Sequence, residues 1–571
     1  LPVIRDFDNR TYIKEDAGKI LLGIFEGNSI PAWDKTNKVP ENFSFGEFQE
    51  NFEHFQPYLE SAIKRFPVLE KAGIRKFFSG PESFTPDTNT LLGEVPEVKN
   101  FFVCCGLNSI GIGSGGGVGK VTAEWLMSGH INEDIFSYDI KRFQKFHSEI
   151  NFIKPRITET LGDLYGMHWP FKQHKTSRNI KTLPHHDNLK SFGACFGVSG
   201  GYERPMWFAL DGEKPEYEYS YNYQSWYPSA EYETNNTIKN VGLFDLSPFS
   251  KFEIKSDKAH IELQKICTAN IKNEPGKCIY THMLNPDGGI EADLTVVCIE
   301  KNHFRIISSA ATRERDKFHI KKYLSKDIEV KDITDDLCVF GLFGPKSREL
   351  IKTISKDNFE NDNFKFGTAK NITIQGTNIW AQRLSYVGEL GYELYVNCKD
   401  AKNIFELIVD KGKNFNLSNC GVHAMDIMRM ESGFLHWGHD ISPEENQYQA
   451  GLSFTISKKK DVEFIGKHSL EKIKQAKIKS KFAMFTLKDC EPGKPLLLHD
   501  EPIYLGDKII GRTTSGNYSF NFKKNLAFGY IDKDILDKEV KNHDLYIEVE
   551  KTKYPADLLI KPLKQTDYKI I

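Results

Sequence analysis

The sequence predicts an α+β protein of several domains that ends in a small β-barrel. Its 571 residues are more than one hydrophobic core usually organises, because domains run to roughly 100–200 residues. Residues 226–470 mix strand and helix patterns, whereas residues 480–571 are mostly short strands between turn residues. The sharpest local signal is the turn Asn285-Pro-Asp-Gly-Gly289, which leads into the β-branched strand Ile290 to Val297.

The charge balance argues against several classes of partner. Lys and Arg number 76 and Asp and Glu 78, a formal net charge of −2, so no net field favours nucleic acid or an anionic membrane. We see no signal peptide and no run of about 18 apolar residues, and therefore expect no membrane span. Ten cysteines without a C-x-x-C pair predict neither a zinc ribbon nor a disulfide framework, and we expect no metal. Heavy use of Lys, Asn and Ile fits a bacterial cytoplasmic protein, or the mitochondrial matrix if the source is eukaryotic.

The first hundred residues alternate short strands with one helix. The chain begins with Leu1 rather than Met, and a strand pattern is already in progress over Leu1 to Arg5. We therefore expect a fragment that lacks its original N-terminus. Between Phe48 and Phe66, apolar side chains recur at helical spacing and predict a helix whose stripe packs in the core: Phe52, Phe55, Leu59, Ile63 and Phe66.

A glycine-rich loop between a strand and a helix invites a nucleotide-binding interpretation. Gly111-Ile-Gly113-Ser-Gly-Gly116 follows the strand Phe101 to Cys105, satisfies the G-x-G-x-x-G pattern and precedes a predicted helix from Val118 to Met127. A dinucleotide fold normally opens with this unit, whereas about 100 residues precede it here and no second strand with a terminal acid follows. Val121 also stands where a P-loop needs Ser or Thr. A strand-to-helix turn without a ligand remains an alternative.

The same segment resembles part of a flavoenzyme. Cys105 to Gly111 and Gly115 to Trp125 are similar to the strand, glycine loop and helix that close the FAD domain of D-amino-acid-oxidase-like sarcosine and dimethylglycine dehydrogenases. Ser137 to Phe143 and Gly201 to Phe208 resemble the bridge between the flavin and folate halves of these enzymes. Their dinucleotide fingerprint and flavin-tethering histidine would lie upstream of this chain. The resemblance implies FAD contacts, through close backbone approach and a helix N-terminus, at Gly106, Asn108, Ser109, Gly111, Gly115, Gly116, Gly117 and Gly119.

The second half resembles the aminomethyltransferase (T-protein) family of the glycine cleavage system. Three ordered motifs carry this resemblance: the turn and strand from Asn285, Ser385 to Leu394, and Asp426 to Leu435. The C-terminal barrel of that family is matched by Glu501 to Tyr504, Gly511 to Gly516 and Leu526 to Ile531. The implied domains are the end of an FAD domain (1–135), a bridge (136–225), a folate-binding domain (226–475) and the barrel (480–571).

Four residues carry the folate chemistry that this resemblance implies. Asp293 would orient tetrahydrofolate, stabilise cationic character or relay a proton, although Ala292 replaces the first acid of the family pair. Glu389 would accept the pterin 2-amino and N3–H donors, with a solvent-facing turn acid as the alternative. Arg429 would contact or brace the site, or form a structural salt bridge. Tyr386 would stack or hydrogen-bond at the folate, or belong to the core.

The family resemblance implies a flavin- and tetrahydrofolate-dependent demethylation of sarcosine or dimethylglycine. Hydride would pass from the N-methyl group to FAD, and the iminium carbon would be captured as 5,10-methylenetetrahydrofolate. The partners would be a small N-methyl amine and an electron acceptor. Two alternatives remain: a non-catalytic relative like the regulatory subunit of pyruvate dehydrogenase phosphatase, and a folate-only aminomethyltransferase.

Overall fold

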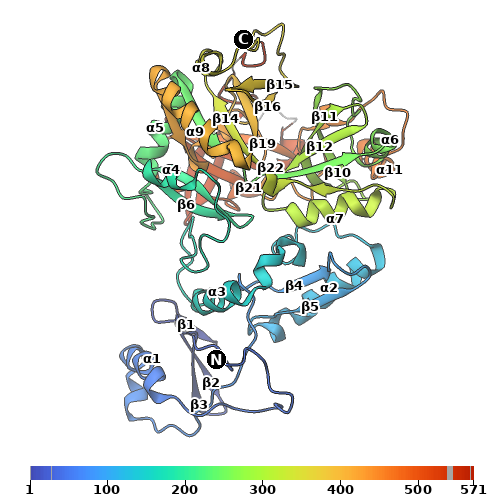
Figure 1. Ribbon diagram of the computed structural model, residues 1–571. Coiled ribbons are helices and arrows are strands. Elements are labelled where there is room, and N and C mark those ends of the chain that lie inside the picture. Colours follow the sequence, from blue (N-terminus) through green and yellow to red (C-terminus); the bar gives the residue numbers. More distant parts are fainter. Residues whose placement is uncertain (1, 28, 477, 537–543, 566, 571) are drawn as a thin grey trace. The chain divides into compact units, whose positions relative to one another are not determined.

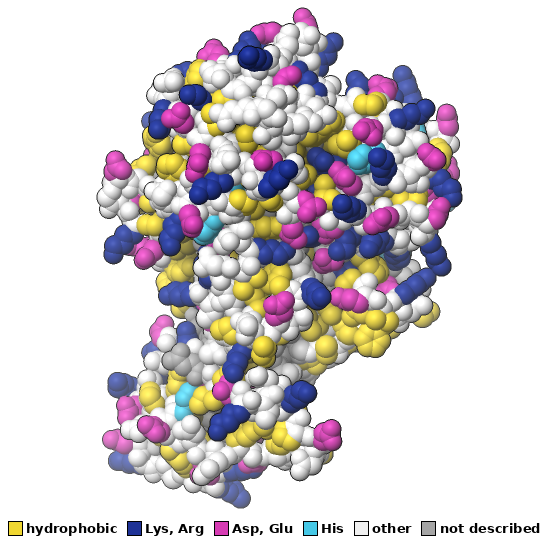
Figure 2. All heavy atoms as spheres, viewed as in Figure 1, with side chains coloured by type: hydrophobic (Ala, Val, Ile, Leu, Met, Phe, Trp, Pro, Cys, Tyr) yellow, Lys and Arg dark blue, Asp and Glu magenta, His cyan; other side chains and the backbone are white. Residues whose placement is uncertain are grey.

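The computed structural model divides into two compact units, which we describe separately (Figure 1). Unit 1 comprises residues 1–129 and 135–178, and unit 2 comprises 130–134 and 179–571. The structure describes residues 2–27, 29–476, 478–536, 544–565 and 567–570. Within these residues no helix is both long and apolar enough to cross a membrane. On the face drawn in Figure 2, basic and acidic side chains are interspersed, which matches the balanced composition.

Unit 1 begins with an antiparallel three-stranded sheet. The helix that follows is less buried than predicted. The strands are β1 (Ile4–Asp6), β2 (Thr11–Asp16) and β3 (Lys19–Ile24). Helix α1 (Phe52–Arg65) lies inside the predicted range and is capped by Asn51, whose side chain accepts the N–H of His54. The predicted core stripe is wrong in part, because Phe52 is 45% exposed. Its ring packs on Phe77 at 4.6 Å instead.

The rest of unit 1 contains a hairpin and two long helices. Strands β4 (Leu91–Glu94) and β5 (Phe102–Cys105) pair antiparallel and lead into helix α2 (Gly111–Ser128). The buried Trp125 anchors α2 on the hairpin, and a Cβ at Gly93 would lie 2.4 Å from its ring. The remaining elements are η1 (Pro67–Lys71), η2 (Ile140–Arg142), η3 (Lys145–Ser148) and α3 (Ile150–Asp163).

Unit 2 is built around a six-stranded sheet with helices on both faces. The strand order is β15-β16-β17-β14-β8-β18, and only β18 is parallel to its neighbour. Residues of α8 and α9 pack on one face (Figure 1), and residues of α10 pack on the other. The strands are β8 (Val241–Asp245), β14 (Leu337–Phe343), β15 (Thr368–Ile374), β16 (Thr377–Arg383), β17 (Gly391–Asn397) and β18 (Leu417–Cys420). The helices are α8 (Ser347–Ile354), α9 (Cys398–Gly412) and α10 (Val422–Glu431).

A five-stranded sheet lies in the same unit and carries the predicted turn. Its order is β10-β11-β12-β9-β13, and residues of α6 and α7 pack on one face. The Asn285 side chain accepts the N–H groups of Asp287 and Gly289, which confirms the turn before β11. The strands are β9 (Ser250–Lys255), β10 (Cys278–Leu284), β11 (Ile290–Glu300), β12 (His303–Ser308) and β13 (Lys331–Asp332), and the helices are α6 (Ala259–Ile266) and α7 (Arg313–Tyr323).

The C-terminal region forms the predicted barrel, which closes completely in the order β19-β22-β21-β20-β23-β24. Its strands are β19 (Ser480–Leu487), β20 (Pro502–Leu505), β21 (Lys508–Ser519), β22 (Lys524–Asp532), β23 (Leu545–Val549) and β24 (Thr552–Leu559). The other elements of unit 2 are α4 (His186–Ser191), β6 (Ala194–Ser199), β7 (Tyr202–Phe208), α5 (Tyr227–Lys239), η4 (Thr334–Asp336), η5 (Lys413–Phe415), η6 (Ser453–Thr455), α11 (Lys467–Gln475) and α12 (Lys533–Leu536).

A buried arginine joins α10 to this barrel. Arg429 is 2% exposed, and its guanidinium lies 2.6 Å from Asp440 and 2.8 Å from Asp426. It also donates to the Ser515 hydroxyl on β21 at 2.9 Å. Burial would lower the pKa of Arg429, but the two carboxylates outweigh it and hold the pKa above its ordinary value. The charge cluster therefore fixes the helix, the segment after it and the barrel to one another.

Replacing Arg429 with Met is expected to destabilise unit 2 severely. The change leaves Asp440 buried without its cation, a defect that costs about 3–5 kcal/mol. Urea unfolding followed by circular dichroism measures the loss. The matched control is Arg512→Met, which removes a 60% exposed partner of Asp500 and should cost less than about 1 kcal/mol. Equal losses in the two variants would contradict the bracing role.

Candidate functional site

Asp293 lies on the face of β11 opposite the core, beside two side chains of β10. Its Oδ1 is 3.4 Å from Nε2 of His282, its direct partner across the strands, and has no hydrogen bond in the described structure. Burial raises the pKa of Asp293 to about 7, although a hydrogen bond from Tyr280 opposes the shift and the charge of Asp316 adds to it. The side chain is still 18% exposed. Asp293 therefore combines a buried environment with access from outside.

The histidine beside this acid is neutral. Burial lowers the pKa of His282 to about 3. Its Nδ1 lies 3.0 Å from the hydroxyl of Thr455, which donates in turn to the carbonyl of Leu452 at 2.8 Å. The hydroxyl is thus placed to accept Nδ1–H, which leaves Nε2 as an acceptor facing Asp293. An acceptor at this position favours the protonated carboxyl.

Tyr386 is within electrostatic range of Asp293, and their membership of a common folate site stays a prediction. Tyr386 lies in the loop after β16, where its hydroxyl donates to the carbonyl of Leu435 at 3.1 Å and its ring stacks on Phe434 at 6.1 Å. Burial raises the pKa of Tyr386, and Asp293 is among the charges that act on it. Tyr280 is in turn within electrostatic range of both Asp293 and Tyr386.

Glu389 is a buried acid that lies beside a lysine. It is 7% exposed and not a solvent-facing turn acid, and its Oε1 lies 2.6 Å from Nζ of Lys564. Burial raises the pKa of Glu389, while the lysine opposes that shift. The same ammonium donates to the carbonyl of Val387 at 3.1 Å. One oxygen of Glu389 is therefore committed within the protein, and its contact with a pterin stays a prediction.

Glu393 lies within the motif Ser385 to Leu394, but the sequence alone assigned it no role. It lies on β17 opposite Gln382 of β16, and the Tyr395 hydroxyl donates to it at 2.9 Å. Burial raises the pKa of Glu393 to about 7. No cation pairs with it in the described part of the chain, and both amide atoms of Gln382 also lack partners. Its charge acts on Cys278, which points to the same side of β10 as Tyr280.

The alternation of β17 was the signal that could have identified Glu393. The strand reads Gly391-Tyr-Glu-Leu-Tyr-Val396, in which one acid stands among residues with a strong preference for strands. Neither Glu393 nor Asp293 of β11 has a cation in its own strand.

Arg429 holds the segment that follows α10 in place. Besides the two carboxylates and Ser515, its guanidinium donates to the carbonyl of Phe434 at 3.1 Å, so four of its five donor hydrogens have protein acceptors. The segment that it holds also supplies the Leu435 carbonyl that accepts from Tyr386. Direct contact between Arg429 and a folate stays a prediction.

In unit 1 the predicted glycine loop is largely helix. Helix α2 starts at Gly111, and not at Val118 as predicted, although each glycine costs about 1 kcal/mol relative to alanine. The loop proper contains Gly106, Asn108 and Ser109, whose φ angles are +65°, +48° and +65°. Packing of the buried Trp125 outweighs the weak propensity of the glycine segment.

This strand, loop and helix have room for a flat cofactor. A Cβ added at Gly115, Gly116, Gly117 or Gly119 would meet no described atom within 4 Å. The first turn of α2 carries no acid, and its cap, Ile110, makes no side-chain hydrogen bond. The N–H groups at the N-terminus therefore remain for a ligand or water. A flavin ring, which needs close backbone approach and gains from nearby N–H donors, fits these features.

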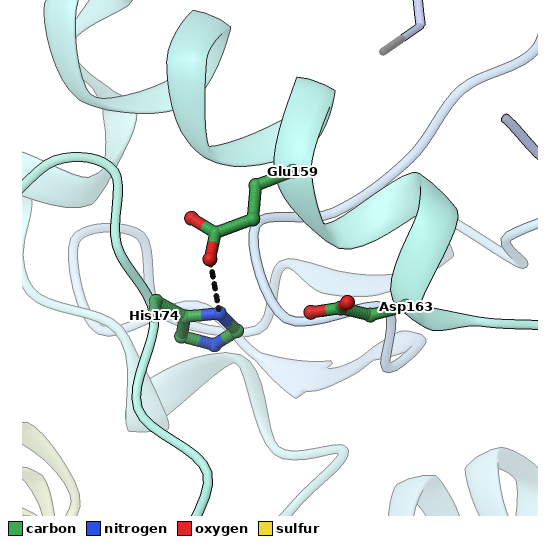
Figure 3. Close-up of side chains that lie close together, drawn as sticks. All are labelled: Glu159, Asp163 and His174. Atoms are coloured by element: carbon green, nitrogen blue, oxygen red, sulfur yellow. Dashed lines mark ion pairs between the residues drawn. The ribbon is translucent and has the colours of Figure 1, made fainter. Parts of the chain in front are cut away.

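Three side chains in unit 1 lie at distances that a metal could span: Glu159, Asp163 and His174 (Figure 3). Glu159 already accepts the N–H groups of Lys175 and Thr176 at 2.8 Å each. Asp163 is paired with Lys172. Since protein donors already occupy both carboxylates, we assign no metal to this cluster.

Comparison with known sequence families matches almost the whole chain. The FAD dependent oxidoreductase family matches residues 1–125, and its central domain matches 128–182. The GCVT N-terminal domain matches 185–460, and the glycine cleavage T-protein C-terminal barrel domain matches 481–564.

Three relatives align with nearly the whole chain. 4-Methylaminobutanoate oxidase (formaldehyde-forming) of Paenarthrobacter nicotinovorans is 37% identical, over 98% of this chain and 67% of its own length. Human mitochondrial sarcosine dehydrogenase is 31% identical, over 93% of this chain and 61% of its own length. The mitochondrial pyruvate dehydrogenase phosphatase regulatory subunit of Mus musculus is also 31% identical, with the same coverage of 93% and 61%. The chain thus spans 61–67% of the length of these relatives.

The order of the matched families is that of the two units and the barrel described above. The chain therefore belongs to the FAD-dependent sarcosine and dimethylglycine dehydrogenase family, which joins a flavin domain to a T-protein-like folate domain and uses FAD and tetrahydrofolate as cofactors.

Proposed function

We propose that the protein takes part in the oxidative demethylation of a small N-methyl amine, sarcosine or dimethylglycine, with capture of the methylene group as 5,10-methylenetetrahydrofolate. One observation carries the folate half of this proposal. Asp293 and Glu393 are acids without a cation partner among the described residues. Asp293 is within electrostatic range of Tyr280 and Tyr386, and Glu393 accepts from Tyr395, which packs in the same cluster as Tyr386. Such groups cost stability unless a ligand compensates for them.

Asp293 is suited to proton transfer. A carboxyl with a pKa of about 7 can both hold and accept a proton near neutral pH. The Nε2 acceptor of His282 and the Tyr280 hydroxyl lie beside it and can share that proton. Asp293 would accept the proton released by the reacting nitrogen of tetrahydrofolate, and burial would limit hydrolysis of a reactive iminium carbon.

Recognition of the pterin is better served by Glu393 than by Glu389. A pterin presents its 2-amino and N3–H donors side by side, and a carboxylate accepts both. Glu393 has no lysine partner in the described structure, whereas Glu389 lies 2.6 Å from Lys564. The unsatisfied amide of Gln382 stands opposite Glu393 and can bond further polar edges of the ring.

The flavin half rests on unit 1. FAD supplies hydride acceptance when bound, and Gly106, Asn108, Ser109 and the N-terminal turns of α2 would hold one side of it. An electron acceptor for the reduced flavin and a cytoplasmic location complete the proposal. A regulatory relative could keep the same fold for protein interaction, but it would not need two uncompensated acids. A folate-only aminomethyltransferase would leave unit 1 without a role.

The variant Glu393→Gln should bind tetrahydrofolate at least tenfold more weakly than the wild type. It loses a charge-assisted hydrogen bond worth about 1.5–3 kcal/mol. Anaerobic isothermal titration of the 571-residue chain measures the dissociation constant. The matched control Glu389→Gln should change affinity less than threefold, while lowering the melting temperature because Lys564 loses its buried partner. The reverse ranking would return pterin recognition to Glu389, and a folded wild type that binds no folate would remove the folate assignment.

The pKa of Asp293 predicts a stability difference that grows with pH. Between the unfolded value near 3.8 and the folded value of about 7, the native state keeps a proton that the unfolded chain has lost. Wild-type stability therefore falls as pH rises through this window, and Asp293→Asn escapes the loss. The variant should gain up to about 4 kcal/mol relative to the wild type between pH 4 and pH 8.

Urea unfolding at these two pH values tests this prediction. The control is Asp287→Asn in the preceding turn, where hydrogen bonds from Asn132 and His130 lower the pKa of an exposed carboxyl. The effect of this control has the opposite sign. The ionised Asp287 stabilises the native state above about pH 4, so Asp287→Asn should be less stable than the wild type at pH 8. A constant difference between Asp293→Asn and the wild type would show that Asp293 titrates normally.

A further inference from the structure

Arg204 is a cation at the same site that the family chemistry above does not use. It lies on β7, and among the described residues its guanidinium contacts the Met425 sulfur at 3.9 Å and the Phe249 ring at 5.5 Å. Its Nε is buried and makes no hydrogen bond to any described residue. Two other buried arginines of unit 2 differ, since Arg305 lies 2.7 Å from Glu253 and Arg313 lies 2.8 Å from Asp332.

The nearest acidic group cannot satisfy this arginine. Asp245 acts on Arg204 from a distance, but its carboxylate is committed to His185 at 3.1 Å and to the N–H of Ser247 at 3.0 Å. Burial lowers the pKa of Arg204 to about 10, so the group remains a cation at neutral pH. A buried guanidinium without a carboxylate is as unfavourable as a buried acid without a cation.

Arg204 contacts the same side-chain cluster as the residues around the acids. Its two contacts, Met425 and Phe249, pack in one hydrophobic cluster with Tyr386 and with Tyr395, whose hydroxyl donates to Glu393. Tyr386 is also within electrostatic range of both Arg204 and Asp293. The Arg204 side chain is partly exposed, although its Nε is not. A ligand that reaches Asp293 and Tyr386 can therefore place an oxygen against this guanidinium.

We propose that Arg204 is a carboxylate-binding residue of the folate cavity. This rests on the proposed function above and extends it. Asp293 and Glu393 suit the donor groups of a reduced pterin, whereas a guanidinium suits an anion and binds a carboxylate through two parallel hydrogen bonds. Two anions can enter such a cavity: the glutamyl carboxylates of tetrahydrofolate, and the carboxylate of an N-methyl amino acid that delivers the carbon.

The experiment compares wild type, Arg204→Met and Arg204→Lys by anaerobic titration with three probes: tetrahydrofolate, 6-methyltetrahydropterin, which lacks the glutamyl tail, and sarcosine. Methionine matches the apolar neighbours Met425 and Phe249, so the variant should fold. If Arg204 binds the glutamyl tail of folate, Arg204→Met should raise the dissociation constant of tetrahydrofolate at least tenfold. It should change the dissociation constant of the pterin less than twofold. Arg204→Lys should recover part of the affinity, because it restores charge without the bidentate geometry.

The remaining outcomes distinguish the two sources of the carboxylate and show how the proposal could fail. Loss of sarcosine binding with unchanged folate affinity supports the amino acid as the source of the carboxylate. Equal weakening of folate and pterin, or no change with any probe, overturns the proposal. A folded wild type that binds neither folate nor pterin removes the folate cavity itself, which distinguishes that failure from the failure of Arg204. Arg313→Met is the control for loss of a buried arginine, and should lower stability without changing any affinity.

Discussion

The contact between Arg429 and Asp440 holds the candidate site in shape. The guanidinium fixes α10 to the barrel, and Asp440 also accepts the N–H of His436 and the hydroxyl of Thr514. The segment between these anchors carries the Leu435 carbonyl that positions the Tyr386 hydroxyl. A buried ion pair is weak evidence for stability by itself, because desolvation offsets much of the attraction. Its geometric consequence matters more here, since it aligns parts of the chain that are far apart in sequence.

The contrast between this ion pair and the cavity is informative. Arg429 has two carboxylates, whereas Arg204, Asp293 and Glu393 each lack a close partner of opposite charge in the described structure. No ion pair joins Arg204 to Glu393 among the described residues. Buried charges kept apart in this way cost stability in the empty protein. We infer that the cost is retained because a ligand with donors at one end and an anion at the other completes the set.

Local chemistry explains what the sequence could predict. The turn at Asn285 follows from one side chain accepting two nearby N–H groups, and β11 with Asp293 follows from the turn. The barrel follows from short strands at regular spacing. The start of α2 at Gly111 could not be predicted in the same way, because glycine propensity opposes a helix. The compensating contact is the packing of Trp125, a residue of α2, against the hairpin.

The choice between Glu389 and Glu393 lay beyond the sequence for a similar reason. Both acids belong to one motif, and nothing within it shows that Lys564, from the far end of the chain, reaches Glu389. The unpaired state of Arg204 is still harder to predict, because it depends on which carboxylates the fold brings near. Among the described residues, none forms an ion pair with it. Sequence patterns report what a residue can do, while long-range packing decides which of its possible partners is present.

The two cavity acids have similar pKa values but different surroundings, and this difference assigns their roles. Asp293 adjoins the Nε2 acceptor of His282 and the hydroxyl of Tyr280, groups that can share or pass a proton. Glu393 accepts a hydrogen bond from the Tyr395 hydroxyl and lies opposite Gln382, and neither of these neighbours titrates near neutral pH. A ligand that donates to both oxygens of Glu393 would favour the ionised form and lower its pKa, whereas Asp293 can keep a pKa suited to proton exchange. Recognition and proton transfer are thus separated between two carboxyl groups that burial alone makes alike.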